Sequence, residues 1–158
     1  MEVLFNFEMK GLDKGIAERA AYIAQQHLAQ AMAERGKKIL DMEFTIEGTI
    51  EGTPWAPLAK STRDRKGFDA VLWETGDLMK SIFVKKTPTG WSFGVESDKF
   101  DPKLHEFGFV HKSGTWVPAR PFIGPAIRQV NREMTQIAKP IIKEFTAELE
   151  ASFVKVTR

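Results

Sequence analysis

A long apolar stripe in the last third of the chain limits the folds available to it. Hydrophobic residues recur there at steps of three and four, at Ile123, Ile127, Val130, Met134, Ile137, Ile141 and Phe145. This spacing puts them on one face of an α-helix, which has about 3.6 residues per turn. Pro118 and Pro121 lead the chain into this helix, where an early proline costs no hydrogen bond. Pro140 lies inside the pattern and predicts a kink or a split.

An alanine-rich segment near the N-terminus predicts a second long helix. Asp13 is suited to begin it, and Gly36 is suited to end it near residue 35. Alternating residues over 3–9 predict a half-buried strand before this helix. Residues 42–47 also alternate, which predicts a short strand unless the helix resumes after Gly36.

Two hairpins are expected between the helices. The first has arms at residues 82–86 and 91–96 and a turn at 87–90. The second pairs residues 107–110 with residues 115–117. We therefore expect one α+β domain over residues 1–158, with a mostly antiparallel sheet and a projecting hairpin. The N-terminal and C-terminal helices flank this sheet and are expected on the same face.

Composition narrows the class of protein. The chain has 158 residues, which is enough for one domain with a hydrophobic core. It contains no cysteine, which excludes disulfides and thiolate metal sites. Its net charge of +2 is too small to attract the protein strongly to DNA. No apolar run approaches the roughly 20 residues of a membrane span, and the start lacks the features of a signal peptide. We expect a soluble product of the cytoplasm that binds no membrane.

The residues offer no familiar catalytic arrangement. The sequence contains no HExxH, GxSxG or glycine-rich phosphate loop. His105, Glu106 and His111 come nearest to a metal set, but polar residues at the base of a hairpin explain them more simply. We therefore expect no enzymatic activity, no cofactor and no metal.

A basic cluster supports an alternative hypothesis, in which the chain is a nucleic-acid-binding module. Lys60, Arg63, Arg65 and Lys66 lie close together, with Phe68 and Trp73 just beyond them. Single-strand sites combine cations with stacking aromatics in this way. Acidic residues interrupt the cluster, so a solvated loop is the simpler interpretation.

The aromatic residues suggest an assembly surface. Trp55, Phe107, Phe109, Trp116 and Phe122 provide more apolar area than one small sheet needs. Exposed apolar patches mark contact surfaces, and aromatics are enriched where binding energy concentrates. Completion of the core is the competing explanation for each of these residues.

Four stretches taken in order resemble the phage virion morphogenesis family, the tail-completion and neck proteins of Mu-like and related tailed phages. They are Glu51–Leu58 followed by Ser61, Thr62 and Lys66, then Leu72–Ile82, His105–Gly108 and Val117–Gly124. The resemblance covers about residues 50–125. Residues 99–104 depart from the family pattern, because Pro102 alters the backbone before the His-Glu-Phe-Gly motif.

The resemblance implies a structural protein of the virion, without a cofactor. Such proteins form rings, often hexameric, where the tail tube meets the head connector, after assembly in the host cytoplasm. The implied partners are copies of the chain, the tail tube protein and the neck or connector proteins, with at most weak contact to passing DNA. A tail terminator, which stops growth of the tail tube, is the alternative within this class.

The expected site residues fall into two groups. The interface is predicted at the second hairpin and the loop 52–68, with Trp55, Leu58, Arg63, Phe107, Phe109, Trp116, Arg120 and Phe122. A structural role is predicted for Thr75, Gly76, Leu78, Gly108, Pro118 and Pro121. Thr75 is expected to cap a turn, and Gly108 to allow a bulge in a strand. Arg120 is expected to pair with Glu106 or Asp77 within the subunit rather than with a neighbour.

Overall fold

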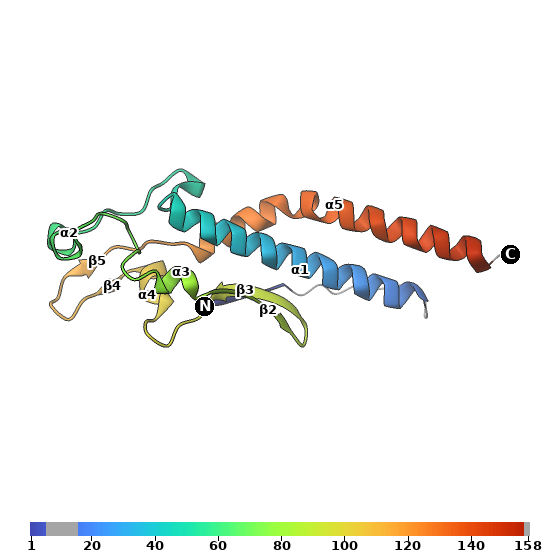
Figure 1. Cartoon of the computed structure of the whole chain (residues 1–158), viewed down its shortest axis with the longest axis horizontal. Coiled ribbons are helices and arrows are strands. Elements are labelled where there is room, and N and C mark those ends of the chain that lie inside the picture. Colours follow the sequence, from blue (N-terminus) through green and yellow to red (C-terminus); the bar gives the residue numbers. More distant parts are fainter. Residues whose placement is uncertain (6–15, 157–158) are drawn as a thin grey trace.

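The computed structural model describes residues 1–5 and 16–156 of the chain. The α+β fold is confirmed, with a three-stranded sheet, a long helix on that sheet and a second long helix on the first (Figure 1). The C-terminal helix packs mainly along the N-terminal one, which separates it from the sheet, so the two helices form successive layers. The expectation that both lie directly on the sheet is therefore corrected.

The first helix, α1, runs through the position that was expected to end it. It spans Ile16–Thr45 and includes Gly36. A Cβ atom at Gly36 would lie 2.6 Å from the ring of Phe93, so this glycine serves close packing of α1 on the sheet. Of the two alternatives for residues 42–47, the strand is wrong and the continuation of the helix beyond Gly36 is confirmed, with Glu43 and Phe44 both buried in α1. Asp13 and the predicted strand beyond residue 5 lie outside the described residues.

The sheet contains β1 (Glu2–Phe5), β2 (Ile82–Thr87) and β3 (Gly90–Val95), in the order β1-β3-β2. All pairs are antiparallel, and the first predicted hairpin is confirmed as β2–β3. Phe93 and Val95 of the central strand are fully buried against α1. The core therefore begins between this strand and α1 and continues on the other side of α1 toward the C-terminal helix.

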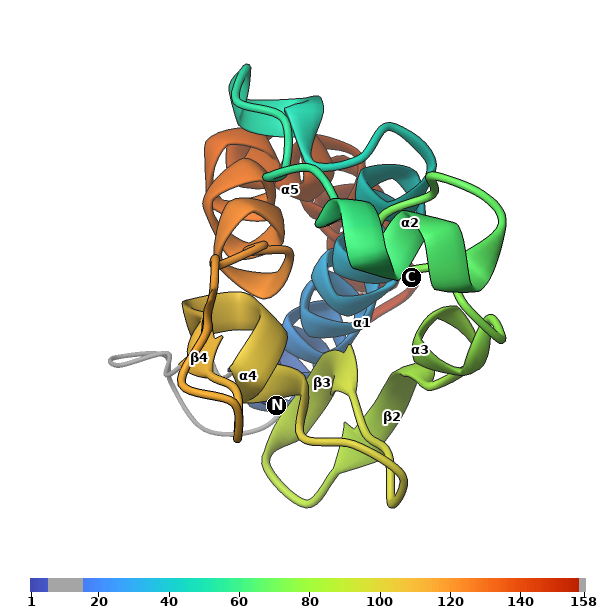
Figure 2. The ribbon, with the colours of Figure 1, turned by 90° about the vertical axis from the view of Figure 1, so that its left-hand side faces the viewer.

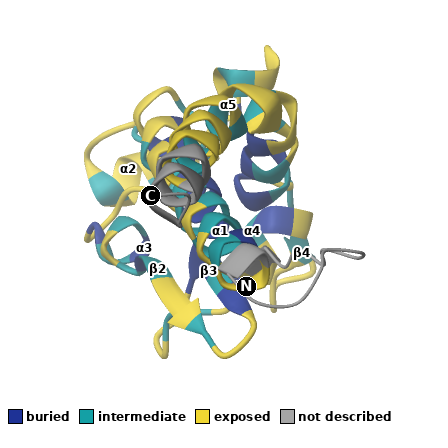
Figure 3. Ribbon diagram, turned by 90° about the vertical axis from the view of Figure 1, so that its right-hand side faces the viewer, coloured by how far each residue is buried: buried dark blue, intermediate teal, exposed yellow. Residues whose placement is uncertain are grey.

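The second long helix, α5, spans Ile123–Val156 and continues without interruption through Pro140. The proline leaves the carbonyl of Gln136 without its helical donor, but both residues are exposed, so water can replace the lost bond. The predicted split is therefore wrong. The outer face of α5 is exposed (Figure 3), and its inner face buries Ile123 and Val130.

One ion pair fixes the two long helices side by side. Arg35 of α1 donates from Nε and Nη2 to the two carboxylate oxygens of Glu133 on α5, at 2.5 and 2.9 Å. Bidentate geometry of this kind is specific as well as strong. The hydrogen bond from Arg35 holds the pKa of Glu133 well below its ordinary value.

The short elements gather at one end of the molecule. They are the 3₁₀-helix η1 (Thr49–Glu51), α2 (Lys60–Lys66), α3 (Asp77–Lys80), α4 (Pro102–Phe107), β4 (Phe109–Val110) and β5 (Trp116–Val117). The second predicted hairpin is confirmed as β4–β5. In the described residues, no helix is long and apolar enough to cross a bilayer.

The His-Glu-Phe-Gly motif is helical rather than extended. Asp101 caps α4 by accepting a hydrogen bond from the backbone N–H of Lys103 at 3.0 Å, and Pro102 occupies the first turn. Gly108 follows α4 with φ of 75°, and an added Cβ would meet the ring of Trp116 at 2.8 Å. The predicted bulge is wrong, because Gly108 ends a helix and lets the hairpin fold back over it.

Candidate functional site

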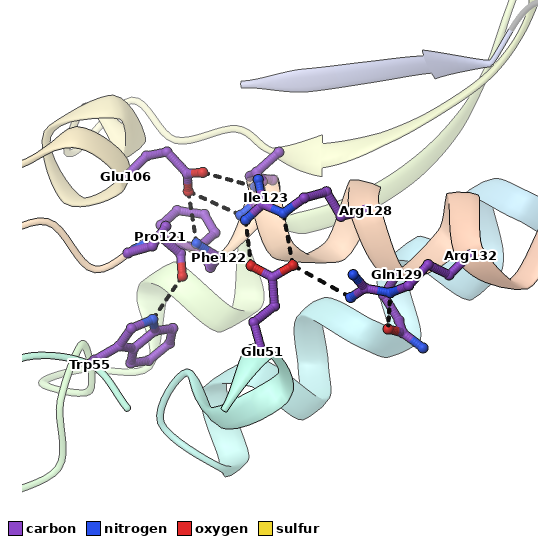
Figure 4. Close-up of polar contacts among 10 residues, drawn as sticks. Glu51, Trp55, Glu106, Pro121, Phe122, Ile123, Arg128, Gln129 and Arg132 are labelled. Carbon is purple, nitrogen blue, oxygen red and sulfur yellow. Dashed lines mark hydrogen bonds and ion pairs between the residues drawn. The ribbon is translucent and has the colours of Figure 1, made fainter. Parts of the chain in front are cut away.

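The carboxylate of Glu106 joins α4 to the start of α5. It accepts hydrogen bonds from the backbone N–H groups of Phe122, Ile123 and Gly124, at 2.8, 3.0 and 2.8 Å (Figure 4). The first N–H groups of a helix have no partner within it, and the helix dipole favours a negative charge there. Glu106 is only 7% exposed, so this cap is an internal connection between two segments of the chain.

A second connection involves Trp55. Its Nε1 donates to the carbonyl oxygen of Pro121 at 2.7 Å (Figure 4). The rings of Trp55 and Phe122 lie 5.5 and 5.4 Å from the ring of Phe44, and all three side chains belong to the core. The contacts of Trp55 and Phe122 are therefore made within the chain.

Arg120 holds the segment after η1 against the start of α5. Its Nε donates to the carbonyl of Ala56 at 2.9 Å and its Nη2 to that of Pro57 at 3.1 Å. The expected intrachain position is found, but the partners are carbonyl groups. The carboxylate of Glu106 already accepts hydrogen bonds from the first residues of α5, and Asp77 pairs with Lys99 at 2.9 Å. Burial lowers the pKa of Arg120, which is 6% exposed.

A groove of about 970 Å³ lies among the short elements, at the end of the molecule that faces the viewer in Figure 2. Side chains spaced by three and four along α2 line one wall; they are Ser61, Thr62, Arg65 and Lys66. Phe109, Trp116 and Val117 of the hairpin line another. Leu78 and Arg120, which are both buried, also line it.

All four stretches that carry the family resemblance contribute residues to this groove. Leu58 comes from the first stretch, Thr75, Gly76 and Leu78 from the second, His105 from the third, and Pro118 and Arg120 from the fourth. These stretches are far apart in the sequence, so the groove is created only by folding. Their convergence makes the groove the candidate functional site, which we call the assembly groove.

Among the other predicted interface residues, Phe109 and Trp116 line the assembly groove, whereas Phe107 and Arg63 are not part of its lining. Phe107 and Trp116 are 65% and 59% exposed, whereas Phe109 is half-buried. Arg63 is exposed and pairs with Asp69 at 3.4 Å.

Thr75 and Gly76, for which a structural role was predicted, shape the backbone just before α3 beside the same groove. The Oγ1 atom of Thr75 accepts a hydrogen bond from the N–H of Asp77 at 3.3 Å, and Gly76 precedes α3 with φ of 75°. Such a φ favours glycine, because other residues are strained there.

Lys66 and Arg120 are the two cations of the groove that form no ion pair with a described residue. Lys66 donates to the carbonyls of Ala70 and Trp73. Burial lowers its pKa, Arg65 and Arg120 lower it as well, and the charges of Glu74 and Asp69 act in the opposite direction. The acidic residues Glu74 and Asp77, which also line the groove, are paired with Arg65 and Lys99, at 2.6 and 2.9 Å. Among the described residues, burial without a charged partner is the cause of the lowered pKa of Arg120, whereas Lys66 lies near Glu74 and Asp69.

His105 adds an unusual polar atom beside these cations. Its Nδ1 is buried and has no hydrogen-bond partner in the described part of the chain. Burial lowers the pKa of His105, and Arg120 lowers it further. His111 is engaged separately, with Nδ1 3.0 Å from Oγ of Ser113. No three His, Asp or Glu residues among those described are arranged to hold a metal ion.

Two features of the site were not singled out from the sequence. Glu106 is the cap of α5, but from the sequence it was considered as a metal ligand or as a partner of Arg120, since nothing local indicates that a helix begins beside it. Glu43 is fully buried in α1, and neither carboxylate oxygen has a partner among the described residues. Its place in an alternating segment suggested an exposed strand position instead.

These features define a small α+β protein in which buried polar groups join distant segments around an aromatic groove. The chain belongs to the phage virion morphogenesis family, whose sequence profile matches residues 11–143. It is also 34% identical over 95 residues to an uncharacterized protein of Methanocaldococcus jannaschii, covering 56% of this chain and 68% of that protein. No solved structure matches the chain. Family membership assigns the chain a structural role in virion assembly.

Proposed function

We propose that the chain forms a ring at the end of a phage tail, where it completes the tail and joins it to the head connector. The observation that carries this proposal is the convergence of the four family stretches on one groove beside an exposed aromatic hairpin. A ring needs two different surfaces on each subunit, since its contacts are head-to-tail. The hairpin and the loop 52–68 supply the candidate surfaces.

The hairpin has properties of a contact element. Each of its strands has two residues, and an isolated two-stranded hairpin is at best marginally stable in water. Val110 and Trp116 pair across it and are 65% and 59% exposed. Large exposed apolar side chains on a short hairpin gain stability when a partner covers them.

The burial pattern divides the predicted interface residues into two sets. Leu58, Arg63, Phe107, Phe109 and Trp116 retain accessible surface and are proposed as direct contacts. Trp55, Arg120 and Phe122 are buried and are proposed to hold those contacts in position.

Nucleic-acid binding fits the described basic residues less well. Arg63 pairs with Asp69 and Arg65 with Glu74, so two of the four cations in the basic cluster are already neutralised. A phosphate backbone is recognised by cations that are free to replace its counterions.

The test is the mass of the protein in solution and in contact with tails. Light scattering after size exclusion, with negative-stain microscopy of the peak, is expected to show a closed ring of about six subunits, alone or after mixing with purified tails. Trp116→Ser and Phe107→Ser are expected to prevent ring formation.

Ile142→Ser provides the matched control, because Ile142 is 56% exposed on the distal part of α5, away from the groove. A protein that stays monomeric and binds no tails contradicts the proposal. Loss of rings in the Ile142 control as well shows that the hairpin is not the contact.

A further inference from the structure

A second recess lies beside the assembly groove, and Trp73 lines both. It has a volume of about 420 Å³ and is lined by Phe44, Thr45, Phe68, Ala70, Trp73 and Met79. Phe68 and Trp73 are 42% and 45% exposed, so part of each ring is uncovered. The hydroxyl of Thr45 already donates to the carbonyl of Asp41 at 3.0 Å. This recess, which we call the aromatic pocket, therefore offers a ligand chiefly apolar contact.

The loop 67–76, which presents these rings, is fixed by hydrogen bonds and shows backbone strain. Lys66 donates from Nζ to the carbonyls of Ala70 and Trp73. Leu72 has φ of 55°, in the left-handed region where a residue with a bulky side chain is strained. Such strain persists only where surrounding contacts fix the backbone, and it is frequent at binding sites. A loop that is already ordered loses little conformational freedom when a partner covers it.

The outer face of α4 carries exposed apolar side chains at the same end of the molecule. Leu104 and Phe107 are 41% and 65% exposed, and Lys103 lies one turn before Phe107 on the same face. None of these three residues lines the assembly groove, whereas His105 on the opposite face of α4 does. Figure 2 shows α4 and α3, which carries Met79 of the pocket, on opposite sides of the end that faces the viewer.

An apolar protrusion and an apolar recess on opposite sides of one chain suit a head-to-tail contact between copies. The face of α4 cannot enter the pocket of its own subunit, because the assembly groove lies between them. Between neighbouring copies, one contact covers Leu104 and Phe107 together with the rings of Phe68 and Trp73. A volume of about 420 Å³ is near the lower end of the range for ligand sites, so it accepts one or two side chains.

The charges beside the two surfaces are complementary. Asp69 lies between the pocket residues Phe68 and Ala70, and its side chain is 59% exposed. Its Oδ2 pairs with Arg63 at 3.4 Å, and its Oδ1 has no partner among the described residues. Lys103 is exposed and forms no ion pair in the described part of the chain. Lys103 of one copy can therefore bind Oδ1 of Asp69 in the next copy while Arg63 keeps Oδ2.

We propose that the outer face of α4 in one copy docks on the aromatic pocket of the next copy, with Phe107 in the pocket and Lys103 on the carboxylate of Asp69. This proposal rests on the proposed function, because it names a contact that closes the ring. It makes a second copy of this chain the occupant of the pocket, and Phe107 the side chain on which the contact mainly depends.

The absence of cysteine from the chain lets two introduced thiols report on this contact. Lys103→Cys and Asp69→Cys proteins are mixed in equal amounts, alone and with purified tails, and treated with a short bismaleimide cross-linker. A linked dimer that contains one chain of each kind is expected, and mass spectrometry identifies it. A chain with both substitutions is expected to give a ladder of linked multiples, because each copy then offers both sides of the contact.

A Lys143→Cys chain replaces the Asp69→Cys chain as the control, since Lys143 is exposed on α5 and does not line the pocket. Its yield of dimer with Lys103→Cys is expected to be at least about tenfold lower. Adding Phe107→Ser to the Lys103→Cys chain, or Ala70→Phe to the Asp69→Cys chain to fill the pocket, is expected to lower the yield at least about tenfold. Thermal melts show that each variant is folded, and Phe107→Ser changes only an exposed residue if Ala70→Phe does not fold.

Three outcomes would overturn the proposal. They are a yield no greater than that of the Lys143→Cys control, a yield that Phe107→Ser leaves unchanged, and linking of Lys103→Cys to itself as readily as to Asp69→Cys. Linking of Lys103→Cys to a tail protein in place of Asp69→Cys would also overturn it, by identifying a different occupant. Imaging of the same samples separates the two proposals. Rings without the link refute only this contact, whereas linked rings that bind no tails refute only the role at the tail.

Discussion

The carboxyl group of Glu43 is expected to make the stability of this protein depend on pH. Glu43 is fully buried, and neither oxygen has a hydrogen-bond partner among the described residues. Its pKa is raised from the ordinary 4.5 to about 7, chiefly by burial; the nearby amide of Ile50 opposes this change, and the charges of Glu51 and Glu106 contribute to it. A buried carboxyl without a partner prefers to remain protonated.

The sign and size of the effect follow from linkage. In the unfolded chain Glu43 loses its proton near pH 4.5, whereas in the folded chain it keeps the proton up to about pH 7. The folded state therefore binds more protons in this window, and its stability falls as the pH rises through it. The difference between the two pKa values corresponds to about 3 kcal/mol of unfolding free energy, fully lost above about pH 7.

Glu43→Gln removes the ionisable group and keeps its shape. Urea unfolding followed by tryptophan fluorescence at pH 5, 6, 7 and 8 measures the free energy of unfolding of both proteins. Between pH 5 and pH 8, the free energy of unfolding of the variant is expected to rise by about 3 kcal/mol relative to that of the natural chain. Glu34→Gln on the exposed face of α1 is the control and is expected to show no such gain. An equal difference between variant and natural chain at pH 5 and pH 8 would refute the reasoning.

Three further substitutions test the connections within the fold. Glu106→Ala removes the acceptor of three backbone N–H groups and is expected to cost about 3 kcal/mol of unfolding free energy in urea; a loss below about 1 kcal/mol would show that water caps α5 equally well. Gly36→Ala is expected to lower the melting temperature, because its Cβ collides with the ring of Phe93 and overpacking costs about 1–3 kcal/mol; an unchanged or higher value would contradict the close packing. Trp55→Phe keeps the ring but loses the hydrogen bond to the carbonyl of Pro121, and urea unfolding is expected to show a loss of about 1–3 kcal/mol. A neutral result would mean that the carbonyl is satisfied by water.

Elements with a local signature were predictable from the sequence. The apolar stripe from Ile123 to Phe145 predicted α5, and the alternating residues on either side of a Pro-Thr-Gly turn predicted the β2–β3 hairpin. The start of α4 also had a local signal, since Asp101 followed by Pro102 is a helix-start pattern, but no helix was predicted from it.

Features that depend on tertiary contact were not predictable. In the sequence, Gly36 resembles the end of a helix. Its place inside α1 is explained only by the ring of Phe93 on the neighbouring sheet, which leaves no room for a Cβ atom there. Arg120 was expected to find a carboxylate, but its acceptors are carbonyls of Ala56 and Pro57, which no sequence pattern marks. The motif stretches were recognised singly, whereas the groove that they share exists only after folding.

The cap that Glu106 provides has a mechanical consequence. Since α4 precedes the β4–β5 hairpin directly and three hydrogen bonds fasten it to the first turn of α5, a rigid-body shift of the hairpin must carry the helix start with it or break those bonds. With 34 residues, α5 is about 50 Å long, so a tilt of about 5° at its start moves its far end by about 4 Å. Because the ion pair of Arg35 with Glu133 and the packing of α5 along α1 resist such a tilt, the hairpin is anchored through Glu106 to the body of the two long helices.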